Sequence, residues 1–135
     1  MAVKVIVKRG KRKEAIARAT VKPGAGRYMV NEVAVNSMTS PFIREVYLEP
    51  LYFFDDVGQF DISVNVNGGG ASGQAQAART AVARALLEAH GAASDSIKQQ
   101  MLAFDRSLLV EDPRRVEPKK FKGPKARARF TKSYR

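Results

Sequence analysis

The side chains of this chain that could do chemistry are mostly cationic, and they gather at its two ends. Residues 113–135 contain ten Lys and Arg against one acid, Glu117, and residues 1–27 contain nine against one acid, Glu14. Residues 28–112 are mildly acidic, and the whole chain carries a formal charge of +11. Ammonium and guanidinium groups at this density bind polyanions, so the charge pattern indicates nucleic acid or an anionic membrane surface.

The C-terminal segment, residues 113–135, has too few aliphatic side chains to fold alone, and we expect an extended tail. Arg binds phosphate through two hydrogen bonds, and the rings of Phe121, Phe130 and Tyr134 could stack on bases. A disordered segment that only keeps the protein soluble is the alternative. The cations of the tail are Arg114, Arg115, Lys119, Lys120, Lys122, Lys125, Arg127, Arg129, Lys132 and Arg135.

A glycine-rich stretch, Gly68–Gln74, is the second candidate site. It lies between an expected strand and an expected helix, where backbone N–H groups and the helix dipole would both point at an anion. Three interpretations are open: a structural start of the helix, an RNA phosphate site, and a dinucleotide loop, because Gly68, Gly70 and Gly73 have the spacing G-x-G-x-x-G. The pattern lacks the repeated βαβ units of a dinucleotide domain and the Lys-Ser/Thr pair of a Walker loop, so we expect no cofactor.

The sequence contains no recognisable catalytic or metal centre. It has no cysteine and one histidine, His90, which ends an expected helix and is interpreted as structural. Asp55, Asp56 and Asp61 lack the spacing of a calcium loop and are interpreted as a solvated turn. We therefore expect no enzyme activity, no metal, no cofactor and no small-molecule substrate.

Length and hydropathy limit the organisation of the chain. Its 135 residues with 44% apolar content can bury one modest core, so we expect a globular body over residues 1–112 and the tail over 113–135. No apolar run approaches the ~18–20 residues that cross a bilayer, which argues against a membrane partner. Zero cysteines and the lack of a signal-peptide pattern indicate a cytoplasmic protein.

Alternation of apolar residues predicts the strands that must position these groups. Strands are expected over residues 2–8, 15–21, 27–31 and 60–67, with 9–13 as a basic connection. The first three strands are expected to be antiparallel to one another. The order of strands in the sheet does not follow from the pattern.

Helix signals fall between and after these strands. Ser40-Pro41 starts a short helix that Pro50 ends, and a longer helix follows the glycine stretch and stops at Gly91. A third helix, capped by Ser94 or Asp95, runs through Leu102. Together the elements predict an α+β two-layer sandwich, a roughly four-stranded sheet with helices on one face. The long helix should turn these residues to the core: Ala75, Ala78, Val82, Ala85, Leu86 and Ala89, with Arg79 and Arg84 on other faces.

Three motifs, in this order and spacing, resemble one protein family. They are Gly10–Ala19 (GKRKEAIARA), Gly68–Gln74 (GGGASGQ) and Gly123–Phe130 (GPKARARF), the last followed by Lys132–Arg135 (KSYR). Over nearly its whole length the sequence resembles the universal ninth protein of the small ribosomal subunit, the ribosomal protein S-nine family. Its Ser-Tyr-Arg ending resembles the archaeal and eukaryotic branch, since bacterial members usually end in Ser-Lys-Arg.

The resemblance implies a fold, partners and site residues. It implies a body of the ribosomal S-five second-domain type with a left-handed crossover, bound to 16S-type rRNA in the head of the small subunit beside neighbouring head proteins. It implies that the tail reaches tRNA in the peptidyl site, with Arg135 on a tRNA phosphate and Lys132 and Tyr134 close behind. It implies rRNA contacts for the other tail cations and for Lys11, Arg12, Lys13, Gly69, Gly70, Ser72 and Gln74. A basic DNA- or RNA-binding protein outside the ribosome is the alternative, although no helix-turn-helix, zinc-finger or RNP1 pattern is present.

Overall fold

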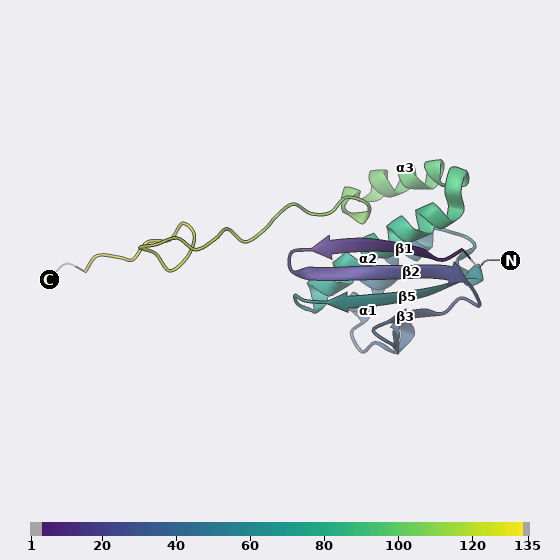
Figure 1. The fold of residues 1–135 in the computed structure, drawn as a ribbon, viewed down its shortest axis with the longest axis horizontal. Helices are drawn as coiled ribbons and strands as arrows, with labels where there is room; N and C mark the ends of the chain where they lie inside the picture. The colour runs from purple at the N-terminus through teal and green to yellow at the C-terminus, as the bar shows by residue number, and fades with distance from the viewer. Residues whose placement is uncertain (1–3, 134–135) are drawn as a thin grey trace.

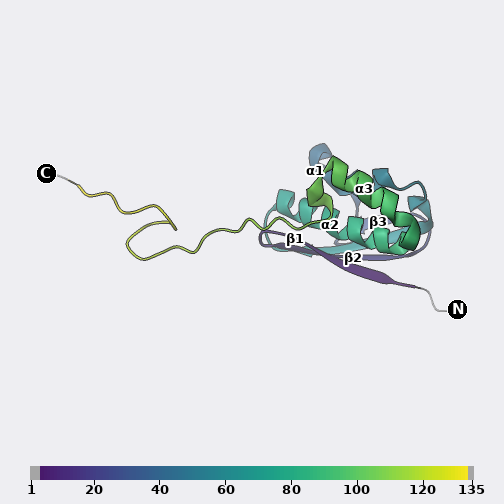
Figure 2. The same ribbon diagram turned by 90° about the horizontal axis from the view of Figure 1, so that it is seen from above.

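The structure is a computed structural model that describes residues 4–133, apart from the side chains of residues 92 and 93. Its body has two layers, a mixed sheet in the order β1-β2-β5-β3-β4 and helices that cover one face of it (Figures 1 and 2). The predicted α+β sandwich is confirmed, with a two-residue fifth strand, β4, too short to show an alternating pattern. The strands are β1 (Ile6–Arg12), β2 (Ala15–Pro23), β3 (Tyr28–Val30), β4 (Val33–Ala34) and β5 (Phe60–Asn67). The helices are α1 (Pro41–Leu48), α2 (Ala71–His90) and α3 (Asp95–Phe104).

Strand β1 begins later and ends later than its alternation predicted. It includes most of the stretch expected to be a basic connection, so the turn to β2 shrinks to Lys13-Glu14. The physical reason is Gly10, where a Cβ would overlap the carbonyl oxygen of Ala77 and lie 2.6 Å from the amide nitrogen of Ala81. Because glycine has no side chain, the strand runs on directly against the backbone of α2.

The central strand of the sheet is β5. It pairs antiparallel with β2 on one side and parallel with β3 on the other. The first three strands alternate in direction, as expected, but β2 and β3 are not neighbours, because β5 lies between them. Burial of one whole face of β5 explains its clean alternation, since Ile62, Val64 and Val66 are at most 6% exposed while the residues between them face away from the helices.

Helix α1 lies in the connection between the parallel strands β3 and β5 and begins as predicted. The Oγ of Ser40 accepts a hydrogen bond from the N–H of Ile43 at 3.5 Å, and Pro41 occupies the first turn. The α-helix ends before Pro50, which lies in the following 3-10 turn Glu49–Phe53.

Helix α2 forms the centre of the core. Of its predicted inward residues, Ala75, Ala78, Val82, Ala85 and Leu86 are fully buried and Ala89 is partly buried. Residues on its other sides are buried as well, because α2 is packed between the sheet and the segments that follow it. These are Ala77, Thr80, Ala81 and Ala83. Gly91 ends the helix with φ of 61°, as predicted, and its N–H donates to the last turn.

Helix α3 and a 3-10 turn, Arg106–Leu108, complete the body. The predicted N-cap hydrogen bond does not form, because a 3-10 turn leads straight into α3 and places Ser94 in a helical conformation. Its Oγ instead donates to the carbonyl oxygen of Gly91 at 2.6 Å. Beyond the body, residues 113–133 contain no helix or strand and leave it as a long tail (Figure 1).

Candidate nucleic-acid interface

The two predicted turns and the start of the tail meet at one end of the sheet. The β1–β2 turn, the glycine turn and the N-terminus of α2 all lie at the end from which the tail departs (Figure 1). Lys13 has a φ of 52°, and Gly68 and Gly69 have φ of 77° and 64°. A Cβ on Gly68 would overlap the carbonyl oxygen of Glu14, so the two turns pack directly against each other.

A groove opens between these turns, which we call the hairpin-end groove. Gly70 caps α2 without a side-chain hydrogen bond, so the N–H groups of the first helical turn have no side-chain partner. Exposed Lys13 and Arg115 add positive charge to the same groove, a combination of donors that suits a phosphate group. Its lining residues are Arg12, Lys13, Glu14, Gly69, Gly70, Ser72, Gly73, Gln76, Arg115 and Val116.

Not every predicted rRNA residue reaches this groove. Lys11 lies on the opposite face of the sheet, because successive residues of a strand point to opposite sides. Gln74 donates from its side-chain amide to the carbonyl oxygen of Gly68 at 3.1 Å, which braces the glycine turn. Gln74 also lines a different groove, beside α1.

Asp112 fixes the beginning of the tail, and the sequence analysis did not identify it as a site residue. Arg12 donates to its carboxylate from the end of β1, and Arg114 donates through Nε and Nη2 at 2.8 and 2.6 Å. The hydrogen bonds from Arg114, supported by the charge of Arg12, hold the pKa of Asp112 well below its usual range. Two cations predicted to contact rRNA are therefore held by an acid of the protein itself. The adjacent acids Glu111 and Asp112, just before a basic tail, are the only sequence signal for this contact.

The outer side of α2 holds the segment that leads to the tail. Arg79, whose side chain is 11% exposed, donates to Glu49 at 2.5 Å and to Asp105 at 3.2 Å. One turn and a half later, Arg84 donates through Nε to the carbonyl oxygen of Leu109 at 3.0 Å. Both arginines were expected only to face away from the core stripe. Their partners lie 25 to 30 positions away in the chain, so no local pattern reveals them.

The tail contains a closed loop. Arg127 donates through Nε and Nη2 to the two carboxylate oxygens of Glu117 at 3.0 and 2.8 Å. These hydrogen bonds lower the pKa of Glu117. The loop bends at Lys122, with φ of 68°, and at Gly123. A Cβ at Gly123 would overlap the carbonyl oxygen of Ala128, in the returning half of the loop. The tail, which was predicted to be extended, is therefore shortened here.

Two aromatic residues of the tail, Phe121 and Phe130, come together at the loop. Phe121 and Phe130 are 87% and 70% exposed and line one shallow groove together with Lys119, Lys122 and Arg129. Exposed rings beside cations are the arrangement that stacks bases and holds the adjoining phosphates. Lys132 is exposed in the last described part of the tail, whereas Tyr134 and Arg135 lie outside the described residues.

His90 packs inside the body and does not line the interface. Its Nδ1 lies 2.7 Å from the carbonyl oxygen of Leu86, and its Nε2 lies 2.5 Å from the carboxylate of Asp56. Its ring packs on Phe54, with ring centroids 4.6 Å apart. Asp56, whose side chain is 40% exposed, thus has a structural partner that the solvated-turn interpretation missed, because His90 lies 34 positions away and local pattern does not reveal it.

Asp61 likewise has a structural role that the solvated-turn interpretation missed. Its Oδ1 accepts hydrogen bonds from the backbone N–H groups of Ala25 at 2.9 Å and Arg27 at 3.1 Å. These bonds, chiefly that from Arg27, lower the pKa of Asp61. The carboxylate thus closes the turn that joins β2 to β3.

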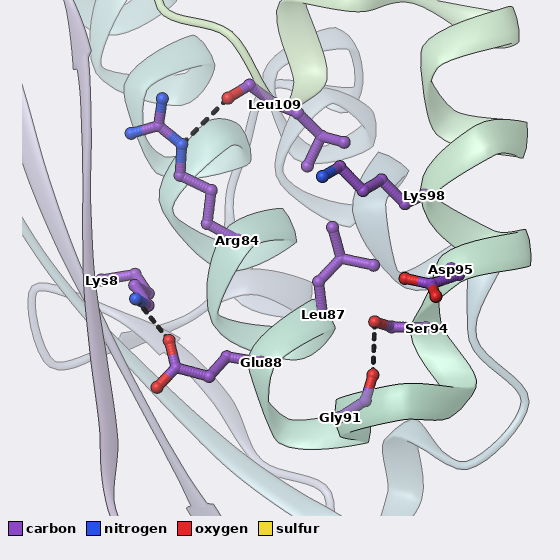
Figure 3. A pocket seen from close by; sticks show the side chains of 9 residues that line it. All are labelled: Lys8, Arg84, Leu87, Glu88, Gly91, Ser94, Asp95, Lys98 and Leu109. Carbon is purple, nitrogen blue, oxygen red and sulfur yellow. Dashed lines mark hydrogen bonds and ion pairs between the residues drawn. The ribbon is translucent and has the colours of Figure 1, made fainter.

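A second groove, between β1 and α3, contains none of the predicted site residues (Figure 3). Lys8 pairs with Glu88 at one side of it, and the side chain of Leu87 points into its middle. Within residues 4–133, three or more His, Cys, Asp or Glu side chains nowhere come together as a metal site. The helices of this part of the chain include none with the length and apolarity needed to cross a membrane.

Comparison with known proteins identifies the family. The profile of the family described as Ribosomal protein S9/S16 matches residues 10–135, which include both turns, the hairpin-end groove and the tail. The chain belongs to the ribosomal protein S9 family. This confirms the resemblance of the three motifs, and, because the family is one of ribosomal proteins, it confirms that the chain is not an enzyme.

Similarity to individual S9 proteins extends over almost the whole chain. The protein named small ribosomal subunit protein uS9 of Halobacterium salinarum is 48% identical over 93% of this chain and 96% of its own. The uS9 proteins of Desulfurococcus amylolyticus and Picrophilus torridus are 45% and 44% identical, covering 98% and 96% of this chain and 94% and 97% of their own. The body and the tail are therefore both shared with these relatives.

Proposed function

We propose that this S9-family chain is a structural protein of the small ribosomal subunit, with a body that binds 16S-type rRNA in the head and a tail that contacts tRNA in the peptidyl site. The observation that carries the proposal is the meeting of the hairpin-end groove and the tail at one end of the body. A body docked through this end would send its tail onward into the RNA that it binds.

The hairpin-end groove supports the rRNA part of the proposal. An RNA phosphate placed at the N-terminus of α2 would meet backbone N–H donors, the hydroxyl of Ser72 and the charges of Lys13 and Arg115. Such contacts carry no sequence information and instead fix the position and orientation of the protein. This suits a structural protein whose site is specified by the folded shape of the rRNA.

The tail supports the tRNA part. At about 3.3 Å per residue, the seventeen residues from Lys119 to Arg135 could reach roughly 55 Å when fully extended. The loop between Glu117 and Arg127 shortens this reach, and phosphates that compete for Arg127 would open it. The C-terminal cations would then lie far from the groove that docks the body. The body would bind rRNA, and the end of the tail would contact tRNA.

Co-sedimentation tests the ribosomal assignment. The tagged full-length chain is expressed in its source cells, and its lysate is run on a sucrose gradient with high magnesium and moderate salt. We expect the protein in the small-subunit fractions, in the cytoplasm as part of that particle. A protein that stays at the top of the gradient would contradict the proposal and favour the alternative, a DNA- or RNA-binding protein outside the ribosome.

Truncation tests the role of the tail tip. Small subunits are reconstituted with a chain that lacks residues 132–135, and filter binding measures peptidyl-site tRNA affinity against salt. The matched control is Lys119→Gln/Lys120→Gln, which removes the same number of tail cations near the body. We expect weaker tRNA binding and a shallower salt dependence for the truncation than for the control, with assembly intact in both. Unchanged tRNA affinity in the truncated form would refute the assignment of the tip.

A further inference from the structure

The face of the sheet that the helices leave open carries cations in register. Arg9 of β1 lies directly opposite Arg18 of β2, and Arg18 lies opposite Asn65 of β5. All three point away from the helices, because their neighbours along each strand are the buried or inward-facing residues. The three residues form a straight row across the sheet, two guanidinium groups followed by an amide.

The two arginines are an unfavourable pair in the isolated protein. The carbonyl oxygen of Arg9 accepts a hydrogen bond from Arg84 outside the sheet, at 2.9 Å. Arg9 and Arg18 therefore form the pair type without mutual backbone hydrogen bonds, in which facing side chains come closest. Like charges directly opposite each other on a sheet destabilise it, so this arrangement indicates a bound anion.

Acids of the protein neutralise this row only in part. Arg9 forms a long ion pair with Glu111 at 3.9 Å, beyond hydrogen-bonding range, and Glu111 accepts its hydrogen bond from Arg84 at 3.2 Å. Arg18 is exposed, and its side chain has no hydrogen bond or ion pair within residues 4–133. The acid on the same face, Asp61, is committed to backbone N–H groups of the turn at 25–27.

The neighbouring rows extend the same chemistry. Lys11 lies one row toward the β1–β2 turn, opposite Ile16 and in line with Asn67. Thr20 and Ser63 lie one row in the other direction. Apart from the exposed Val7 and Ile16 in these rows, the open face is cationic and rich in hydrogen-bonding groups, whereas the centre of a protein–protein interface is usually depleted in charge. These properties match a phosphate backbone with its sugar hydroxyls.

We propose that the open face of the sheet is a second RNA-binding surface, on which Arg9 and Arg18 clamp a backbone phosphate and Asn65 contacts the adjoining nucleotide. Guanidinium groups suit this because each can hold phosphate through two hydrogen bonds, and the phosphate removes the repulsion between them. The surface is distinct from the hairpin-end groove, which opens beside the helices, and it gives Lys11 a place among the RNA contacts. This inference rests on the proposed function, since it names a second part of the body that would hold rRNA.

The test uses the full-length chain and a transcript of the small-subunit rRNA from the same source, with affinity measured by filter binding over a salt series. The variants are Arg9→Gln/Arg18→Gln and Arg18→Glu. The matched control is Lys98→Gln/Arg106→Gln, which removes two exposed cations from the helix side of the body. Thermal unfolding of each protein without RNA checks the fold.

RNA affinity is expected to fall in the arginine variants, whereas the melting temperature is expected not to fall. The Arg9/Arg18 double variant should bind about tenfold more weakly than the control, with a salt slope shallower by about 0.9, because the contact with one clamped phosphate is lost. The melting temperature of both Arg18 variants should equal or exceed that of the wild type, since each removes a like-charge pair. If the Arg9/Arg18 double variant binds rRNA as tightly as the control, the inference is overturned. It is also overturned if the double variant keeps its rRNA affinity and loses binding only to poly-glutamate, an acidic polypeptide measured in parallel. Failure of the wild-type chain to bind the transcript would overturn the proposed function as well, so the two failures are distinguishable.

Discussion

Arg12, the last residue of β1, donates a hydrogen bond to the carboxylate of Asp112, one hundred positions later in the chain. The contact ties the end of the β1–β2 hairpin to the beginning of the tail. Both partners are largely shielded, with side chains 20% and 13% exposed. The direction in which the basic tail leaves the body is thus built into the fold.

Breaking this contact should loosen the beginning of the tail without unfolding the body. In Arg12→Gln and in Asp112→Asn, we expect residues 113–118 to gain fast backbone motion, because the tail then has one fewer attachment to β1. Heteronuclear NOE values measured by NMR would fall in that segment. Lys13→Gln is the matched control, since Lys13 is an exposed neighbour. Unchanged NOE values in both variants would mean that other contacts fix the tail.

The attachment should also resist acid. The pKa of Asp112 lies below its usual value, so the ionised form is favoured by folding, and its stabilising effect is present above the unfolded pKa of about 3.9. The effect is lost only as pH falls through the lower, folded pKa. An NMR titration of the Asp112 carboxyl carbon should therefore show a midpoint well under that of a model aspartate. A midpoint at or above the model value would contradict the contacts with Arg114 and Arg12.

Gly10 should be irreplaceable because β1 touches the backbone of α2 there. We expect Gly10→Ala to lower the free energy of unfolding by about 1–3 kcal/mol, since the added Cβ forces strand and helix apart. The measurement is urea unfolding followed by circular dichroism. Gly58→Ala is the control, because a Cβ at Gly58 meets no atom within 4 Å, and its effect should stay within about 0.5 kcal/mol. Equal stability of the two variants would rule out the close approach.

Arg79 should stabilise the body through its acidic partners. Arg79→Met would leave Glu49 and Asp105 without their cation in a partly buried setting. We expect the free energy of unfolding to fall by about 2 kcal/mol. Chemical unfolding measures this loss. Lys98→Met, on the exposed side of α3, should change stability by less than about 0.5 kcal/mol. A loss no greater than that of the control would show that water replaces the arginine without penalty.

The loop in the tail should compete with RNA for Arg127. Because both partners of the Glu117–Arg127 pair are exposed, Glu117→Gln should leave the stability of the body unchanged. It should strengthen binding of the full-length chain to the rRNA transcript at low salt and steepen the salt slope by about 0.9, as one cation is released. Arg127→Gln should act in the opposite direction on RNA binding. If Glu117→Gln weakens binding instead, the closed loop is the form that binds.

Much of this protein follows from local sequence. The alternation over 60–67, the Ser40-Pro41 helix start and the long helix ending at Gly91 correspond to elements in the structure, because each depends on residues close in the chain. The charge of the tail and the three motifs sufficed to indicate the partner class and the family. These features are encoded by neighbours, so reading them requires no knowledge of the fold.

Only the tertiary structure decided which distant residues meet. The placement of β5 between β2 and β3, the extension of β1 through Gly10, and the partners of Arg12 and Arg79 all join segments far apart in sequence. Such contacts depend on how whole faces pack against each other, and local periodicity carries no information on that choice. The run from Lys11 to Lys13, a single basic motif in the sequence, is divided by the strand between the open face of the sheet and the hairpin-end groove, since side chains alternate along a strand.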